Sequence, residues 1–190
     1  MSDTSASLTC DAGSSVLLVI DIQTKLTRVM PIKVLARLQR YTGVLLKAAN
    51  TLKIPVLVTE QYPKGLGHLE PEISVLLADD AKRYEKTSFS CAGTTEFMEA
   101  LSQSGRKQAI LVGMEAHVCV LQTAMDLKSL GYQIFVVADA VCSRHRESYE
   151  TALIRMRQAG VIIVNAESVL FEWLRDAKHE QFKTIQSLIT

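Results

Sequence analysis

The feature that most constrains the fold is an alternation of short, wholly apolar runs with longer amphipathic stretches. The runs 16–20 (VLLVI) and 55–59 (PVLVT) are rich in β-branched residues and show no polar alternation, which is typical of strands buried on both faces. Between them, apolar residues recur at three- and four-residue steps after Pro31, which predicts a long helix ending near Leu52. Strand, helix and strand in this order predict a parallel sheet with right-handed crossovers.

The same alternation continues along the chain. Further strands are expected at 81–86, 109–113, 133–138 and 161–165, and further helices at 73–77, from a Thr94 cap to Leu101, from His117 to Leu130, and at 147–158, 167–176 and 180–189. The stretch 60–72 has no periodicity and is expected to be a functional loop. No linker or repeat interrupts the chain. We therefore expect one domain over 1–190, a three-layer α/β/α, Rossmann-like fold around a six-stranded parallel sheet, with residues 1–14 as a flexible tail.

Composition excludes several classes of function. Lys and Arg (21) nearly balance Asp and Glu (20), so the net charge of +1 argues against a nucleic-acid partner and against a basic membrane-surface helix. No apolar run approaches the length of a membrane span, and the polar N-terminus lacks the layout of a secretory signal. The four cysteines form no CxxC pair or Cys/His cluster, which suits a reducing compartment. We expect a cytoplasmic protein.

One cysteine occupies a position suited to chemistry. Within 109–130, an apolar run ends in Gly113 and an amphipathic pattern begins near His117, so Cys119 is expected in the first turn of a helix that follows a buried strand. The open amides and positive dipole end of a helix favour a thiolate there. A buried cysteine is more often inert packing, so the assignment needs partners for the thiol.

Two charged residues supply such partners at neighbouring strand ends. Asp21 closes the first strand and Lys86 closes the third, and the carboxyl ends of parallel strands meet at one edge of the sheet. Alone, the aspartate reads as a strand terminator and the lysine as a solvated charge. Together they suit hydrolysis, with Cys119 as nucleophile, the carboxylate as general base and the ammonium as charge balance. Amides at Glu115 and Cys119 are expected to form an oxyanion hole.

The phrases VIDIQ, YEKTSFSC and VGMEAHVCV resemble the isochorismatase-like cysteine hydrolase family. The resemblance runs from about Val16 to Asn165, and TEQYPKGLG, EKTSFS and QFKTIQSLI are most similar to its isochorismatase-domain-containing subgroup. It implies the strand order 3-2-1-4-5-6, a catalytic triad of Asp21, Lys86 and Cys119, and a cis peptide at Met114–Glu115.

Departures from better-known members narrow the chemistry that the resemblance implies. Nicotinamidases bind a divalent metal through an Asp-x-His ligand set, whereas here the corresponding loop offers Glu60 and a lone His68, so we expect no metal, no cofactor and no nicotinamidase activity. Isochorismatases that cleave a vinyl ether lack the cysteine. We therefore expect the protein to cleave a small amide, carbamoyl or ester substrate through a thioester intermediate.

Several other residues can each be interpreted in two ways. Gln23, Tyr62 and Phe89 are candidate pocket residues or ordinary loop packing, and His117 is a candidate substrate ligand or a capping residue. Cys91 and Cys142 also follow strands, but neither begins a helix after a glycine turn, so we expect packing or pocket lining. Arg144, His145 and Arg146 are expected to be a solvated charge run.

Two other kinds of protein compete with the hydrolase hypothesis. One is a catalytically silent family member that binds or scaffolds through its oligomer interface. The other, a redox-sensing thiol, is weaker because no second cysteine near Cys119 in the sequence could resolve a sulfenic acid. The resemblance and the apolar fraction of 48% favour a homo-oligomer, a dimer or tetramer.

Overall fold

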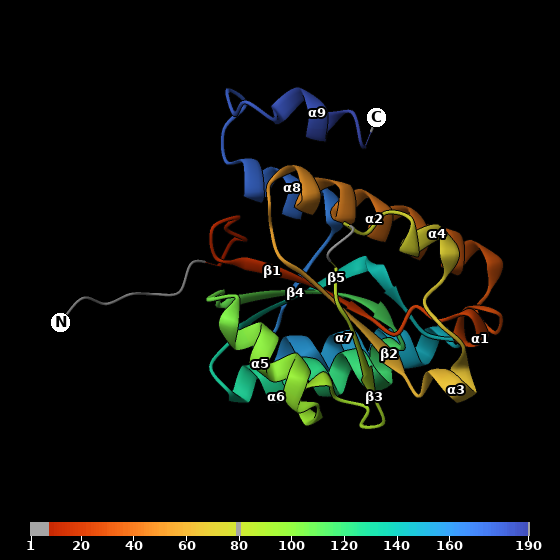
Figure 1. Ribbon diagram of the computed structural model, residues 1–190. Coiled ribbons are helices and arrows are strands. Elements are labelled where there is room, and N and C mark those ends of the chain that lie inside the picture. Colours follow the sequence, from red (N-terminus) through yellow and green to blue (C-terminus); the bar gives the residue numbers. More distant parts are fainter. Residues whose placement is uncertain (1–7, 79–80, 190) are drawn as a thin grey trace.

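A computed structural model of the chain describes residues 8–78 and 81–189, and these form a parallel sheet between two layers of helices (Figure 1). Within the described residues the sheet has six strands in the order β3-β2-β1-β4-β5-β6, which confirms the predicted fold class and strand order. All neighbouring strands pair in parallel. The strands are β1 (Ser15–Ile20), β2 (Val56–Gln61), β3 (Arg83–Lys86), β4 (Gln108–Met114), β5 (Gln133–Cys142) and β6 (Ile162–Val164).

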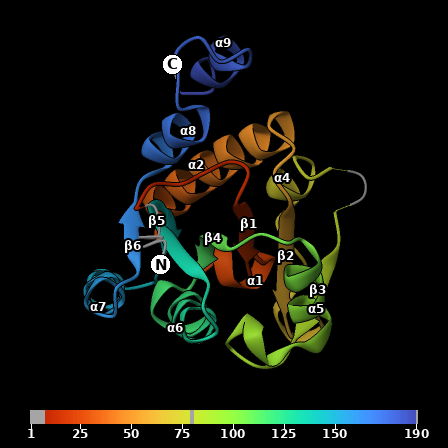
Figure 2. The same cartoon turned by 90° about the vertical axis from the view of Figure 1, so that its left-hand side faces the viewer.

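Helices cover both faces of this sheet, as Figures 1 and 2 show. One layer holds α2 (Ile32–Thr51), α4 (Pro71–Ser74), α8 (Ala166–Leu174) and α9 (Phe182–Gln186). The other holds α5 (Thr95–Gln103), α6 (Leu121–Ser129) and α7 (Arg146–Gln158). Short helical turns lie near the carboxyl ends of the strands: α1 (Thr24–Thr27), α3 (Pro63–Leu66), the 3-10 turn η1 (Cys91–Gly93) and the π-helical turn η2 (Ala116–Val120).

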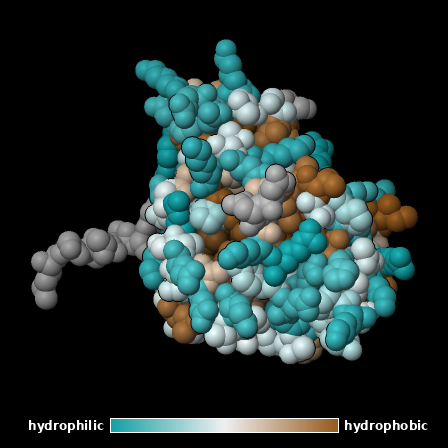
Figure 3. All heavy atoms as spheres, in the orientation of Figure 1, coloured by the Kyte–Doolittle hydropathy of each residue, from teal (hydrophilic) through white to brown (hydrophobic). Residues whose placement is uncertain are grey.

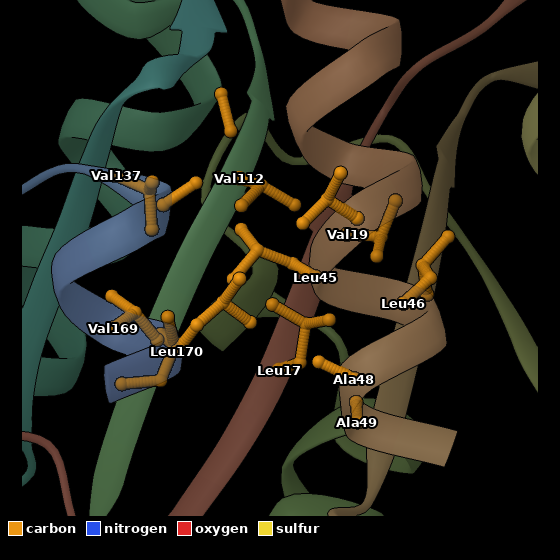
Figure 4. Close-up of a cluster of buried hydrophobic side chains, with 14 of the residues drawn as sticks. Leu17, Val19, Leu45, Leu46, Ala48, Ala49, Val112, Val137, Val169 and Leu170 are labelled. Carbon is orange, nitrogen blue, oxygen red and sulfur yellow. The ribbon is translucent and has the colours of Figure 1, made fainter. Parts of the chain in front are cut away.

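The apolar runs are continuous because each central strand packs against both layers. In β1, Leu17 and Val19 belong to the core under α2 and α8, whereas Val16, Leu18 and Ile20 belong to the core on the opposite face. Figure 4 shows the first of these cores, where Leu45 from α2 and Leu170 from α8 approach Leu17 and Val112. Burial on both faces fixes the register of β1 and therefore the position of Asp21, the residue that follows the strand.

Several boundaries differ from those predicted. The strand β5 runs to Cys142, beyond the predicted end at residue 138, because an irregularity between Leu111 and Gly113 lets it resume pairing at Val141. The short helix predicted at 73–77 is α4, at Pro71–Ser74. Thr94 does precede α5, but its side chain makes no capping hydrogen bond.

The segment before β1 is held in place where the structure describes it, from residue 8 onward. Cys10 is fully buried, and its amide donates to Glu172 Oε2 at 2.6 Å. The Asp11 amide donates to Gln108 Oε1 at 2.7 Å. Cys10 and Asp11, which fall within the flexible tail expected over 1–14, are thus tied to α8 and β4, while residues 1–7 lie outside the described part.

The surface in Figure 3 is mostly hydrophilic, with hydrophobic residues scattered between. Large exposed apolar side chains include Val29 and Ile32 near the start of α2, and Tyr62 and Phe89 in the loops after β2 and β3. Across 8–78 and 81–189, none of the helices is long and apolar enough to cross a membrane.

Candidate active site

Asp21 leaves β1 at the carboxyl edge of the sheet in an unusual backbone conformation. Its φ is +51°, its side chain is 0% exposed, and its amide donates to the Thr59 carbonyl at 3.1 Å. On the neighbouring strand β4, Gly113 allows the backbone of β1 to approach closely at this point. Its φ is +121°, and a Cβ there would lie 2.0 Å from the Ile20 carbonyl oxygen. A side chain at position 113 would push β1 and β4 apart directly beside Asp21.

Lys86 meets this carboxylate because of the pairing of the edge strand. The β2–β3 register places Gln61 opposite Lys86. Lys86 Nζ donates to Asp21 Oδ2 at 2.6 Å and to Gln61 Oε1 at 2.7 Å, and both charged side chains are 0% exposed. The carbonyls of Ser88 and Phe89 accept from the same ammonium at 3.2 and 3.0 Å. Lys86 is thus surrounded by four oxygen acceptors.

The same ion pair sets the protonation of Lys86 and Cys119. Burial lowers the pKa of Lys86, but the charge of Asp21 outweighs it with help from the nearby thiols, so the pKa lies above its usual value. Burial raises the pKa of the Cys119 thiol, the charge of Asp21 and a hydrogen bond to Asp21 raise it further, and Lys86 opposes them. The thiolate expected from the helix start is therefore wrong for the resting site, where Cys119 is a thiol facing a carboxylate.

The turn that carries Cys119 begins directly after β4. The Met114–Glu115 peptide is cis, and the chain continues into the π-helical turn η2 and then α6. The Glu115 side chain is nearly buried, and its Oε1 accepts from the Arg144 amide at 3.1 Å and from Arg144 Nε at 3.0 Å. Arg144 is exposed, as expected for a solvated run, and it also fastens this turn to the end of β5, whereas Arg146 pairs with Glu150 on the surface of α7.

Gln23 differs most from its prediction as a pocket residue. It is fully buried, its Nε2 donates to the carbonyls of Gln61 and Gly67, and its Oε1 accepts from the Gln61 amide. All its side-chain polar atoms bind the backbone at the end of β2 and in the loop that follows. Gln23 therefore fastens that loop to the start of α1, and its side chain has no free polar atom for a substrate.

The other predicted pocket residues are spread over different surfaces. Tyr62 lines a cavity of about 460 Å³ together with Lys86 and Thr94. The Phe89 side chain is about half exposed, while its carbonyl contacts Lys86. His117 lines a separate cavity of about 330 Å³ with residues of α7, and its Nδ1 lies 3.0 Å from Ser143 Oγ. The structure does not bring His117 into the cavity of Tyr62.

The cluster also includes Thr59 and Gln61, which were not predicted, and Cys91, which was expected as packing or pocket lining. Thr59 Oγ1 donates to Asp21 Oδ1 at 2.7 Å, and Gln61 accepts from Lys86 as described above. Cys91 is completely buried, and its Sγ lies 3.7 Å from Thr59 Oγ1. Thr59 and Gln61 are neither acids, bases nor nucleophiles, but two polar residues two apart at the end of an apolar strand share one face of the sheet. That spacing was the available signal.

Glu60 and His68, weighed above as a metal pair, contact each other. Glu60 is 3% exposed, its Oε1 accepts from the Leu69 amide at 2.8 Å, and its Oε2 lies 3.0 Å from His68 Nδ1. Within the described residues, no group of three His, Cys, Asp or Glu side chains could hold a metal ion. Glu60 here orders the loop, and metal independence stays a prediction.

Comparison with known proteins agrees with this architecture. The isochorismatase domain matches residues 15–168. Isochorismatase domain-containing protein 2 of Xenopus laevis is 41% identical over 176 residues, which cover 93% of this chain and 83% of that protein. The fold and the covered length define an α/β protein of the isochorismatase type. This chain belongs to the isochorismatase family, and its curated relatives include proteins named isochorismatase domain-containing protein 2.

Solved structures extend the comparison. The structure described as the MAR1 ribonuclease from Caenorhabditis elegans superposes with a TM-score of 0.89 at 37% identity, over 95% of this chain and 92% of that one. The YcaC gene product from Escherichia coli, described as an octameric hydrolase of unknown specificity, has a TM-score of 0.88 at 24% identity, over 97% and 92% of the two chains. At that identity the second likeness shows the fold alone.

Proposed function

We propose that the chain is a metal-independent cysteine hydrolase that cleaves a small amide, carbamoyl or ester substrate with Asp21, Lys86 and Cys119. The observation that carries this proposal is the fully buried pair of Asp21 and Lys86, whose carboxylate also faces the Cys119 thiol. Burying two charges costs several kcal/mol each before their attraction is counted. A buried ion pair of this kind is therefore more typical of a functional site than of a group that only stabilises the fold.

The protonation of the cluster fits general-base catalysis. Because the Cys119 pKa is raised, the sulfur attacks the substrate carbonyl carbon as Asp21 takes the thiol proton. The C=O electron pair moves to oxygen, and the resulting oxyanion is held by the amides of Glu115 and Cys119. Asp21 then protonates the departing amine or alcohol as the tetrahedral centre collapses to a thioester. Water, deprotonated by Asp21, cleaves the thioester and restores the thiol.

Lys86 acts in this scheme as a fixed positive charge. Its raised pKa keeps it an ammonium, and its four oxygen partners hold it against the carboxylate. It thereby balances the negative charge of the Asp21 side chain before the attack. Tyr62 and Phe89 are proposed as exposed apolar walls for substrate.

The test is turnover by matched cysteine variants. A panel of small amides, carbamoyl compounds and esters is screened with the wild type, and hits are repeated with Cys119→Ala and with Cys142→Ala, a buried thiol outside the cluster. The first variant is expected to lose at least a thousand-fold in kcat, whereas the second keeps turnover. Turnover by Cys119→Ala at the wild-type rate would remove the nucleophile assignment.

Two other functions have specific support. A catalytically silent binding protein is suggested by the high Cys119 pKa, because such a thiol is unreactive without general-base help. Ribonuclease activity is suggested by the description of the Caenorhabditis elegans structure, although the net charge of +1 offers no general attraction for RNA. Incubating wild type and Cys119→Ala with end-labelled RNA and with the same small-molecule panel separates the three functions.

A homo-oligomer, dimer or tetramer, is part of the proposal. Ile32 is 86% exposed and Val29 is 56% exposed, both near the start of α2, and Phe89 beside the cluster is also exposed. Apolar side chains placed in this way suit burial by a second copy. Light scattering of the wild type and of Ile32→Asp tests this. A wild type that is monomeric at micromolar concentration would refute it.

A further inference from the structure

The polar groups behind Asp21 form a directed chain on the side of the carboxylate opposite Lys86. Lys86 approaches Oδ2, while Thr59 Oγ1 approaches Oδ1 at 2.7 Å. A carboxylate paired with an ammonium only accepts hydrogen bonds, so Thr59 must be the donor. The single hydroxyl hydrogen of Thr59 is therefore committed to Asp21.

The oxygen of the Thr59 hydroxyl can also accept a hydrogen bond, and Cys91 is placed to donate it. Its Sγ lies 3.7 Å from Thr59 Oγ1, within reach of an S–H···O hydrogen bond. Burial, chiefly, and the charge of Asp21 raise the pKa of Cys91 to about 11, so the residue is a thiol and a donor at neutral pH. The Cys91 amide in turn donates to Thr123 Oγ1 at 3.0 Å, which ties η1 to α6 and fixes the thiol behind Thr59.

We propose that Thr59 is a positioning residue for the general base: oriented by the Cys91 thiol, its hydroxyl holds the Asp21 carboxylate towards the Cys119 thiol. The hydrogen bonds run from Cys91 to Thr59 and from Thr59 to Asp21, and each polarises the next. Thr59 binds Oδ1 and Lys86 binds Oδ2, so the two donors together fix the orientation of the carboxylate. This inference rests on the proposed function, in which Asp21 is the base.

Both residues behind Asp21 are buried, so the effect of removing the Thr59 hydroxyl can be separated from the effect of changed packing. Thr59 is 1% exposed and Cys91 is 0% exposed, so no bulk water replaces a lost donor. Thr59→Val keeps the shape of the side chain and removes the hydroxyl, whereas Thr59→Ser keeps the hydroxyl and removes the methyl group. A packing role would respond mainly to the serine variant, while the proposed role responds to the valine variant.

The readout is the rate at which iodoacetamide alkylates Cys119 at pH 7, quantified by mass spectrometry of the labelled peptide. Because the thiol gives its proton to Asp21 as the sulfur attacks, Asp21→Asn should slow labelling by about a hundred-fold or more. Thr59→Val should slow it about tenfold, the scale of one hydrogen bond to a charged group.

The other variants complete the test. Thr59→Ser should keep the wild-type labelling rate, and Cys91→Ala should slow labelling by less than Thr59→Val does. Thr42→Val is the matched control, because Thr42 is fully buried and its hydroxyl has no hydrogen-bond partner among the described residues. Circular dichroism verifies that each variant is folded at pH 7.

The outcomes separate this inference from the proposed function. Labelling that Asp21→Asn slows and Thr59→Val leaves unchanged would overturn the role of Thr59 alone. A labelling rate in Cys91→Ala equal to that of the wild type would remove Cys91 from the chain of hydrogen bonds. Labelling of Asp21→Asn at the wild-type rate would overturn both the positioning role and Asp21 as the base.

Discussion

Removing the Lys86 ammonium should strongly destabilise the protein, and the cost follows from the contacts of that side chain. In Lys86→Met the Asp21 carboxylate, which is 0% exposed, keeps the Thr59 hydroxyl but loses its counter-ion. The Gln61 side-chain oxygen and the carbonyls of Ser88 and Phe89 lose a donor as well. Leaving one buried charge unpaired typically costs about 3–5 kcal/mol. That is a large part of the 5–15 kcal/mol by which a domain is usually stable.

A double-mutant cycle isolates the pair. Urea unfolding is measured for the wild type, Lys86→Met, Asp21→Asn and the double variant, in which both charges are gone. We expect Lys86→Met to lower the free energy of unfolding by about 3–5 kcal/mol, and the double variant to recover at least about 2 kcal/mol of the summed loss. A loss below about 1 kcal/mol in Lys86→Met, or additive single effects, would refute the view that these charges are desolvated and depend on each other.

Three further predictions concern other described features. Gly113→Ala should cost about 3 kcal/mol or more in urea unfolding, because its Cβ would lie 2.0 Å from the Ile20 oxygen, whereas Gly105→Ala, with a φ of +67° and open space around it, should cost only about 1 kcal/mol; equal losses would contradict the reasoning. Thr42→Val should stabilise by about 1 kcal/mol in the same assay, since it removes a buried hydroxyl that lacks a partner, and a destabilised variant would contradict it. The pKa of Cys91 is raised from 9.0 to about 11, so the unfolded chain loses this proton first, and the contribution of Cys91 to the free energy of unfolding should fall by up to about 3 kcal/mol as the pH rises from 9 to 11. Cys91→Ala should show a shallower fall between those pH values, and an unchanged slope would count against the thiol.

The strands could be predicted largely because burial on both faces leaves a clear pattern. The run 16–20 has no polar residue, and Asp21 is the first charge after it, so the sequence itself marks where the strand delivers its side chain to the edge. The strand β3 (RYEK) is mostly charged and has no such pattern, so Lys86 was placed only by its position at the end of a predicted polar strand. Placing these residues at one edge needed only the parallel order of the strands.

What could not be predicted depends on contacts between distant segments. Cys10 is buried through Glu172, which lies 162 residues away, and nothing in a polar N-terminal composition indicates such a contact. The pairing of Gln61 with Lys86 is a matter of register between strands. The pKa of Cys119 depends on burial and on Asp21, neither of which can be read from the sequence around the cysteine.

The loop after β2 is too well fastened to act as a gate. Gln23 holds the backbone of Gln61 and Gly67, Glu60 accepts from the Leu69 amide, and the Glu70 amide donates to the Ile22 carbonyl. Opening this segment would break these bonds together, beside the strand that presents Asp21. The amides of Gln61, Leu69 and Glu70 should therefore exchange with solvent deuterium as slowly as those of the central strands. Selection of a substrate on this side then depends on whether it fits a preformed wall, because the wall does not close around it.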